Sequence, residues 1–212
     1  MLWAPNYGGG YPFADGCYEA SSEDSDFYLL DTDQDGQLDM SDDMYTPYYP
    51  GDDAVDWVGM SVFHLGNRRS WEENDVPEEG SFIARITGTY LGPDGDQRAV
   101  PDFYQLYVEE HRKPMAITET VALYNPAMSG ADERLIKQCW WRQVFSQRVT
   151  DDFPGIKMIL WFEWRKFESE VGDFVDWSLT FNPELAEAFY NDVRSDWLIF
   201  ATDLQRIQFS KR

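Results

Sequence analysis

Histidine, cysteine, basic side chains and long apolar runs are all scarce in this sequence. The two histidines, His64 and His111, are too few for a metal site built on imidazole ligands. The two cysteines, Cys17 and Cys139, exclude a disulfide-rich scaffold and a structural zinc site, and whether they pair is left open. No apolar segment is long enough to span a bilayer, and the N-terminus has no signal-peptide pattern.

The shortage of basic residues limits the possible partners. Seventeen Lys and Arg residues stand against 39 Asp and Glu residues, which gives a net charge of −22. Such a chain repels nucleic acid and anionic membrane surfaces, because binding to phosphate needs cationic side chains. A bound divalent cation or a neutral polysaccharide is compatible with the charge. Aromatic residues make up 17% of the chain, and they either fill a core or line a groove in which sugar rings stack.

Apolar runs that alternate with helical patterns predict an α/β fold. Continuous apolar strands separated by helices indicate a parallel sheet that helices cover. The start of the expected helix at 183–207 is supported by Asn182, a suitable N-cap, and by Pro183 at the first helical position. The mixed segment 81–91 is compatible with the start of another helix. The sequence predicts strands at residues 2–5, 54–63, 115–120 and 157–164, and helices at residues 102–112, 132–147 and 183–207.

Each expected strand ends in polar or aromatic residues, which is where barrel folds of this type place their chemistry. These residues are Asn6, Ser61, His64, Glu119, Glu163 and Trp164. Glu119 closes an otherwise buried strand, and burial of a charge is costly without partners. It is either an exposed or salt-bridged carboxylate or the nucleophile of a glycosidase, and the pattern alone leaves both open.

Residues 31–42 carry the spacing of an EF-hand calcium loop. Oxygen ligands stand at the first, third and fifth positions, and Gly36 supplies the sharp turn at the sixth. The last ligand is Asp where an EF-hand has Glu, so its affinity is expected to be lower. The spacing predicts a bound Ca²⁺ that would order the long polar segment 15–53. The alternative is an acidic loop that is solvated and binds no cation. The predicted ligands are Asp31, Asp33, Asp35, Gln37 (through its carbonyl), Asp39 and Asp42.

Four short segments resemble glycoside hydrolase family 26 in their order along the chain. They are Leu-Trp-Ala-Pro-Asn at 2–6, Tyr-Tyr-Pro-Gly-Asp-Asp-Ala-Val-Asp-Trp-Val-Gly at 48–59, Lys-Pro-Met-Ala-Ile-Thr-Glu-Thr at 113–120, and Lys-Met-Ile-Leu-Trp-Phe-Glu-Trp at 157–164. The resemblance implies strands five to eight of a (β/α)₈ TIM barrel. Residues 1–212 are then the C-terminal part of one catalytic domain, a half barrel with the calcium loop inserted.

The resemblance implies a secreted, retaining endo-β-1,4-mannanase that acts on β-mannan. Glu119 matches the nucleophile on strand seven. Trp161 or Trp164, on strand eight, matches the aromatic platform beneath the sugar next to the scissile bond. Core packing is the alternative for either tryptophan, and it is preferred for Trp161 if Trp164 faces the cleft. Asn6 and His64, at the ends of other strands, are further candidates for substrate contacts.

Two departures from the family pattern weaken the expectation of activity. The family's acid/base Glu lies on strand four, which precedes the segments that match here. Phe63 stands where the family usually has a Tyr that hydrogen-bonds near the nucleophile, and Phe has no group to donate. The chain as written is therefore expected to hydrolyse little or no mannan. The alternative function is a non-catalytic carbohydrate-binding relative, and exposed strand edges predict self-association.

Overall fold

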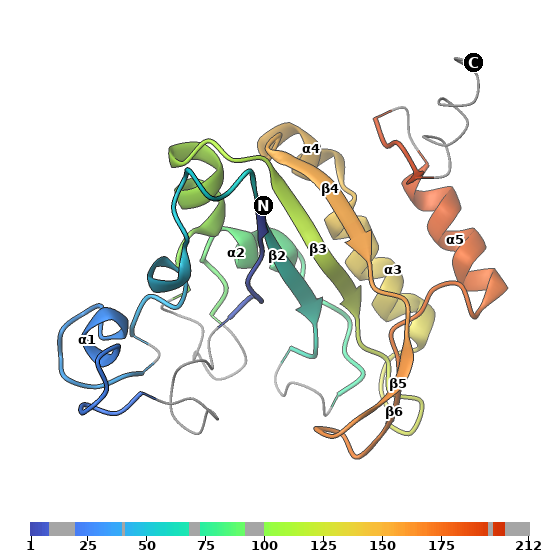
Figure 1. The fold of residues 1–212 in the computed structure, drawn as a ribbon. Helices are drawn as coiled ribbons and strands as arrows, with labels where there is room; N and C mark the ends of the chain where they lie inside the picture. The colour runs from blue at the N-terminus through green and yellow to red at the C-terminus, as the bar shows by residue number, and fades with distance from the viewer. Residues whose placement is uncertain (9–19, 40, 68–72, 92–99, 195–196, 202–212) are drawn as a thin grey trace.

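A parallel four-stranded sheet is the centre of the molecule (Figure 1). The computed structural model describes residues 1–8, 20–39, 41–67, 73–91, 100–194 and 197–201. The sheet has the order β1 (Leu2–Trp3), β2 (Trp57–His64), β3 (Met115–Ala122), β4 (Ile156–Trp161), and all neighbours are parallel. A separate antiparallel hairpin follows, made of β5 (Arg165–Glu168) and β6 (Asp173–Asp176). The predicted α/β class and the sequential parallel strands are confirmed.

Most of the described helices lie on one face of this sheet, whereas the four-residue helix Phe27–Leu30 lies away from it, and the described helices leave the other face uncovered (Figure 1). The helices are α1 (Phe27–Leu30), α2 (Ser81–Ile86), α3 (Glu133–Val144), α4 (Gln147–Asp152) and α5 (Pro183–Val193), with a 3-10 turn at Thr46–Tyr48 and a π-helix at Tyr104–Glu110. Two predicted helix starts have side-chain caps: Asp132 accepts from Leu135 N, and Asn182 accepts from Leu185 N. Within the described segments, no helix has the length and apolar character needed to cross a membrane.

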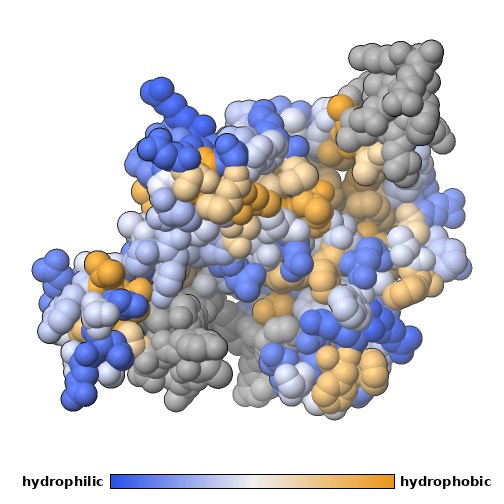
Figure 2. All heavy atoms as spheres, viewed as in Figure 1, coloured by the Kyte–Doolittle hydropathy of each residue, from blue (hydrophilic) through white to orange (hydrophobic). Residues whose placement is uncertain are grey.

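The core lies between the sheet and the helices. Met60 and Val62 of β2 and Ile117 of β3 are completely buried, and they pack in one cluster with Ile136 and Trp140 of α3. The apolar runs of β2 and β3 thus have the environment expected of central parallel strands. The opposite face carries Leu2, Met158 and Leu160 in exposed positions, and Figure 2 shows apolar side chains over this open face.

Three expectations about the C-terminal third were wrong. The strand at 157–164 was expected to be buried, but β4 is an edge strand in which Met158 and Leu160 are 41% and 44% exposed. The β5–β6 hairpin was not predicted at all. The last helix ends at Val193, because Arg194 has an extended backbone, and not near residue 207. The far end of that predicted helix (202–207) lies outside the described residues, as does Cys17. Since β1 and β4 are the edge strands, self-association through them stays a prediction.

Candidate active site

A β-bulge in β3 places Glu119 on the open face of the sheet. Met60 pairs with Ile117 and the next residue, Ser61, pairs with Glu119, so Thr118 is an extra residue in β3. Ile117 and Thr120 are both completely buried on the helix side. Strict alternation after Ile117 would turn Glu119 toward the helices, whereas the extra residue leaves Glu119 exposed. Bulges of this kind commonly re-aim a side chain beside an active site.

Hydrogen bonds on both sides of the sheet fix the two faces of the bulge. On the helix side, Trp140 Nε1 donates to Thr120 Oγ1 at 2.9 Å. On the open side, the hydroxyl groups of Ser61 and Thr118 lie 3.2 Å apart. A side chain at Gly59 would meet Thr118 Cγ2 at 2.9 Å, so the bulged residue packs tightly against β2. The position of Glu119 is therefore determined by packing that does not involve its own carboxylate.

Asn6, Ser61 and Glu119 form a row across three neighbouring chain segments. Asn6 forms an isolated parallel bridge with Ser61, and Ser61 pairs with Glu119 in the sheet. Tyr45 holds this end of β1, because its hydroxyl donates to Asn6 O at 3.3 Å and accepts from Gly8 N at 3.1 Å. Among the described residues, the Glu119 carboxylate has no hydrogen-bond partner, so it is available to a ligand.

The structure separates the two candidate tryptophans. Trp161 packs between the sheet and the helices, with ring centroids 5.5 Å from Phe189 and 6.3 Å from Phe145. Trp164 is 56% exposed and stacks on Phe162 at 6.3 Å. Trp164 also lines an open hollow of about 590 Å³ together with Glu163, Arg165 and Phe181. Trp164 is therefore the tryptophan available to a sugar ring, and Trp161 has the core position foreseen as its alternative.

Phe63 lies on the same face as Glu119 but belongs to an aromatic cluster. It pairs with Val121, two residues beyond Glu119 in β3. Its ring centroid lies 5.9 Å from Phe162 and 5.7 Å from Trp177. Phe63 therefore contributes an apolar wall near Glu119, and it supplies no hydrogen bond that could orient the carboxylate.

His64 does not join this row. It is buried on the helix side, where its ring lies 5.9 Å from that of Trp140 and its Nε2 is 2.9 Å from Asp75 O. Burial lowers the pKa of His64 from 6.5 to about 4. The imidazole is therefore neutral at ordinary pH and faces away from the open side of the sheet, so this strand-end residue has a structural position.

The buried imidazole predicts acid sensitivity of the fold. The unfolded chain binds a proton at His64 near pH 6.5, whereas the folded chain binds it only near pH 4. The contribution of His64 to the free energy of unfolding is therefore complete above pH 6.5 and falls as the pH drops toward 4. Between pH 7.5 and 4.5 the wild type should lose about 2–3 kcal/mol of unfolding free energy more than His64→Gln, measured by urea titration. His111→Gln serves as the surface control and should behave like the wild type. Equal losses in wild type and His64→Gln would contradict the prediction.

Glu163, the glutamate that follows β4, forms hydrogen bonds within the fold. Its carboxylate accepts hydrogen bonds from Leu179 N at 2.8 Å, Thr180 N at 3.2 Å and Thr180 Oγ1 at 2.9 Å. These bonds close the turn that leads into α5. With three donors bound to it, this carboxylate is committed to the fold and is not directed at the open face of the sheet.

The acidic loop brings three of its predicted ligands together. Carboxylate oxygens of Asp31, Asp33 and Asp35 lie within 4.8 Å of one another, and Asp31 is buried. The turn has the expected shape, because Gly36 has a φ of +86° and its N–H donates to Asp31 Oδ2 at 3.0 Å. An oxygen-only set of this kind suits a hard divalent cation.

The other predicted carboxylate ligands, Asp39 and Asp42, form hydrogen bonds within the loop, and ligation through the Gln37 carbonyl stays a prediction. The carboxylate of Asp42 is buried and accepts from Thr32 N at 2.6 Å and Asp39 N at 3.0 Å. Asp39 itself accepts from Ser41, and the Gln37 side chain donates to Asp35. Asp42 therefore closes the loop through hydrogen bonds to backbone N–H groups. The carboxylates that lie close enough together to hold a cation are those of Asp31, Asp33 and Asp35.

Comparison with protein-family models gives no match for this chain, and comparison with curated proteins gives none either. The candidate site therefore depends on the geometry alone. Glu119 and Asn6 lie on the open side of the sheet and Trp164 lies exposed beyond its C-terminal edge, whereas His64 and Trp161 face the helices. Beside Glu119, Ser61 was noted only as a strand-end residue, and Thr118 was not predicted at all. Their hydroxyl pair depends on the bulge, for which the sequence offers no local signal.

Proposed function

We propose that this chain is part of a retaining glycoside hydrolase of the β-mannanase type, with Glu119 as its nucleophile. One observation carries the proposal: a bulge in the middle of a parallel strand exposes a carboxylate on the open face, beside Ser61 and Asn6. The parallel sheet with helices on one face is compatible with part of a (β/α)₈ barrel. Trp164 offers an exposed ring for the apolar face of a sugar.

The proposed reaction is a double displacement. A Glu119 oxygen attacks the anomeric carbon, the glycosidic bond breaks, and the leaving oxygen takes the bonding electrons. Water then attacks the same carbon, the bond between that carbon and the Glu119 oxygen breaks, and the water loses a proton to solvent. This step releases the sugar and restores the carboxylate. A natural leaving group needs a proton from a second carboxyl group, and the proposal assigns that role to no residue of this chain.

The test uses a mannoside whose leaving group needs no protonation. A 2,4-dinitrophenyl β-mannoside can transfer its sugar to the nucleophile even where no acid catalyst is present. The adduct is located by mass spectrometry of peptides. A mannosyl group on Glu119 would support the proposal, and an adduct elsewhere or none at all would exclude Glu119 as the nucleophile.

A second candidate function is carbohydrate binding without catalysis. It is favoured by Phe63, which supplies no hydrogen bond near Glu119, and by the absence of any partner that orients the Glu119 carboxylate among the described residues. This candidate predicts that soluble β-mannan binds, that the activated mannoside leaves no adduct, and that Glu119→Gln does not change the affinity.

We also propose that the loop 31–42 binds Ca²⁺ through Asp31, Asp33 and Asp35. These three residues fit the cation because their oxygens converge around the turn at Gly36, while backbone N–H groups hold Asp31 in place. Millimolar calcium is an extracellular condition, so the proposal agrees with a secreted protein. The cation would fix the loop next to Tyr45, whose hydroxyl bonds to the Asn6 segment.

Calcium should therefore stabilise the chain. Millimolar CaCl₂ is expected to raise the Tm by about 5–10 °C relative to chelator, because a ligand that binds only the folded state stabilises it. The double substitution Asp33→Asn and Asp35→Asn should remove this shift. Asp26→Asn with Asp53→Asn, a control that removes the same charge outside the loop, should retain it. If both double variants respond equally, calcium only screens the net charge and the site is wrong.

A further inference from the structure

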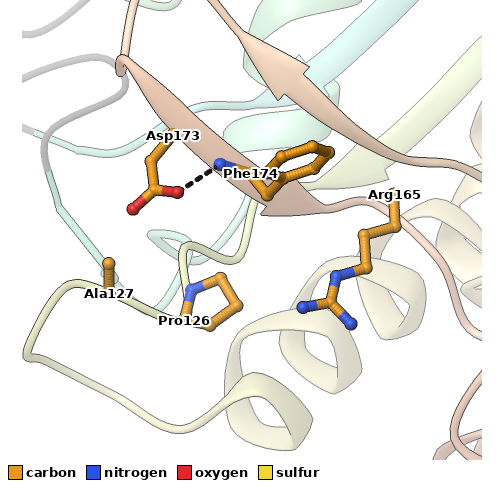
Figure 3. Close-up of a pocket in the computed structure, with 5 residues that line it drawn as sticks. All are labelled: Pro126, Ala127, Arg165, Asp173 and Phe174. Atoms are coloured by element: carbon orange, nitrogen blue, oxygen red, sulfur yellow. Dashed lines mark hydrogen bonds between the residues drawn. The ribbon is translucent and has the colours of Figure 1, made fainter.

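An open hollow of about 610 Å³ lies between the β5–β6 hairpin and the segment that leads from β3 to α3 (Figure 3). Arg165, Asp173 and Phe174 line it from the hairpin, and Pro126 and Ala127 line it from the opposite side. Figure 3 shows the Arg165 and Asp173 side chains directed toward the space beside Pro126 and Ala127. The volume is within the range of small-molecule sites.

The wall formed by Pro126 and Ala127 is held in place by a buried amide. Asn74 Nδ2 donates to Asn125 O at 2.8 Å and to Met128 O at 2.9 Å, and Asn74 Oδ1 accepts from Asn125 N at 2.9 Å. Asn125 Oδ1 in turn accepts from Ala127 N at 2.9 Å. This segment therefore has a fixed shape before any ligand binds, and that lowers the entropic cost of binding.

The hairpin wall is fixed as well. Asp176, at the end of β6, contacts the buried Lys137 of α3, and Trp177 Nε1 donates to Glu168 of β5 at 2.9 Å. Arg165 and Phe167 lie on one face of β5, and Phe174 of β6 lies opposite Phe167 on the same face. The two phenylalanines are each 54% exposed. Of the two rings only Phe174 lines the hollow, and an exposed ring beside an arginine indicates a surface that contacts a ligand with both apolar and polar groups.

We propose that this hollow binds one pyranose unit of a neutral polysaccharide. A pyranose has apolar C–H faces for Phe174 and Pro126, and hydroxyl groups that accept from Arg165 and donate to Asp173. Arg165 alone would suit an acidic sugar, but Asp173 lines the same space and repels a carboxylate. The polysaccharide class rests on the proposed function, whereas the position of the site rests on the hollow itself.

The hollow at Trp164 adjoins the hairpin hollow, because the two share a lining residue. Arg165 lines both, and Trp164 and Phe181 line the other. Adjacent units of one polysaccharide chain can therefore occupy the two hollows, with Arg165 between them. The hairpin site is then a binding subsite that adds affinity and takes no part in bond cleavage.

The experiment measures binding of soluble β-mannan by isothermal titration calorimetry to the wild type and three variants. Phe174→Ala should weaken the affinity about tenfold, and Asp173→Ala about fivefold. Phe167→Ala is the matched control, because Phe167 faces Phe174 across the hairpin with the same exposure but does not line the hollow. It should change the affinity less than about twofold. Thermal unfolding confirms that each variant is folded.

The outcomes separate this inference from the proposed function. Equal effects of Phe174→Ala and Phe167→Ala, or no effect of either, would overturn the hairpin site. Binding of polygalacturonate in preference to the neutral polysaccharides β-mannan, β-glucan and xylan would overturn the choice of a neutral ligand. Failure of all four polysaccharides to bind would overturn it as well. Labelling of Glu119 by the activated monosaccharide needs only the row at Asn6, Ser61 and Glu119, so it succeeds or fails independently.

Discussion

The activated mannoside should label the wild-type chain at Glu119 and should leave Glu119→Gln unlabelled. Glutamine keeps the size of the side chain but its amide oxygen is a poor nucleophile, so the rate of adduct formation should fall by roughly 10³-fold or more. The substitution should hardly alter stability, because Glu119 is exposed and has no hydrogen-bond partner among the described residues. Release of dinitrophenol, followed by absorbance, measures the same step independently of mass spectrometry.

Glu163→Gln is the control for this experiment. Glu163 follows β4, and its carboxylate accepts hydrogen bonds from Leu179 N and Thr180, so it has a structural role. The variant should keep the adduct on Glu119, with some loss of stability. If Glu163→Gln abolishes labelling while Glu119→Gln retains it, the two carboxylates have been assigned the wrong roles.

The central strands and α3 could be predicted because their sequence patterns and their environments agree. β2 and β3 are apolar runs with both neighbours in the sheet, and α3 has an apolar face and an N-cap at Asp132. β4 has a similarly apolar sequence but lies at an edge with Met158 exposed. Composition does not separate a central strand from an edge strand, because the difference depends on which segments pack beside it.

The candidate site was predicted only in part, for the same reason. Glu119 was predicted at a strand end, but it lies within β3 (Met115–Ala122). Its direction depends on the extra residue Thr118, and a bulge is fixed by the register of two strands that are distant in sequence. The missed β5–β6 hairpin had one local signal, Gly172 in the turn between the two strands, where φ is +70°. No element was predicted between the strand at 157–164 and the helix at 183–207, and a single glycine does not by itself predict a hairpin.

Lys137 connects α3 to the hairpin that forms one wall of the proposed sugar site. Its ammonium group is completely buried and donates to Glu133 at 2.6 Å, to Asp176 at 3.3 Å and to Ser178 O at 2.6 Å. Asp176 also accepts from Ser178 N and Ser178 Oγ. Loss of the ammonium group therefore leaves two carboxylates facing each other in a partly buried space, without the charge that compensates them.

Lys137→Met should accordingly destabilise the chain by about 3–5 kcal/mol, which corresponds to a fall in Tm of roughly 6–20 °C. Arg148→Met is the matched control, because Arg148 and Asp152 form another pair with the same spacing in a helix, but at 68% and 56% exposure. It should cost less than about 0.5 kcal/mol. Urea unfolding measures both values. Similar values for the two variants would mean that the buried network contributes no more than a surface pair, and the hairpin would then have to be held mainly by the apolar contacts of Val175 and Trp177.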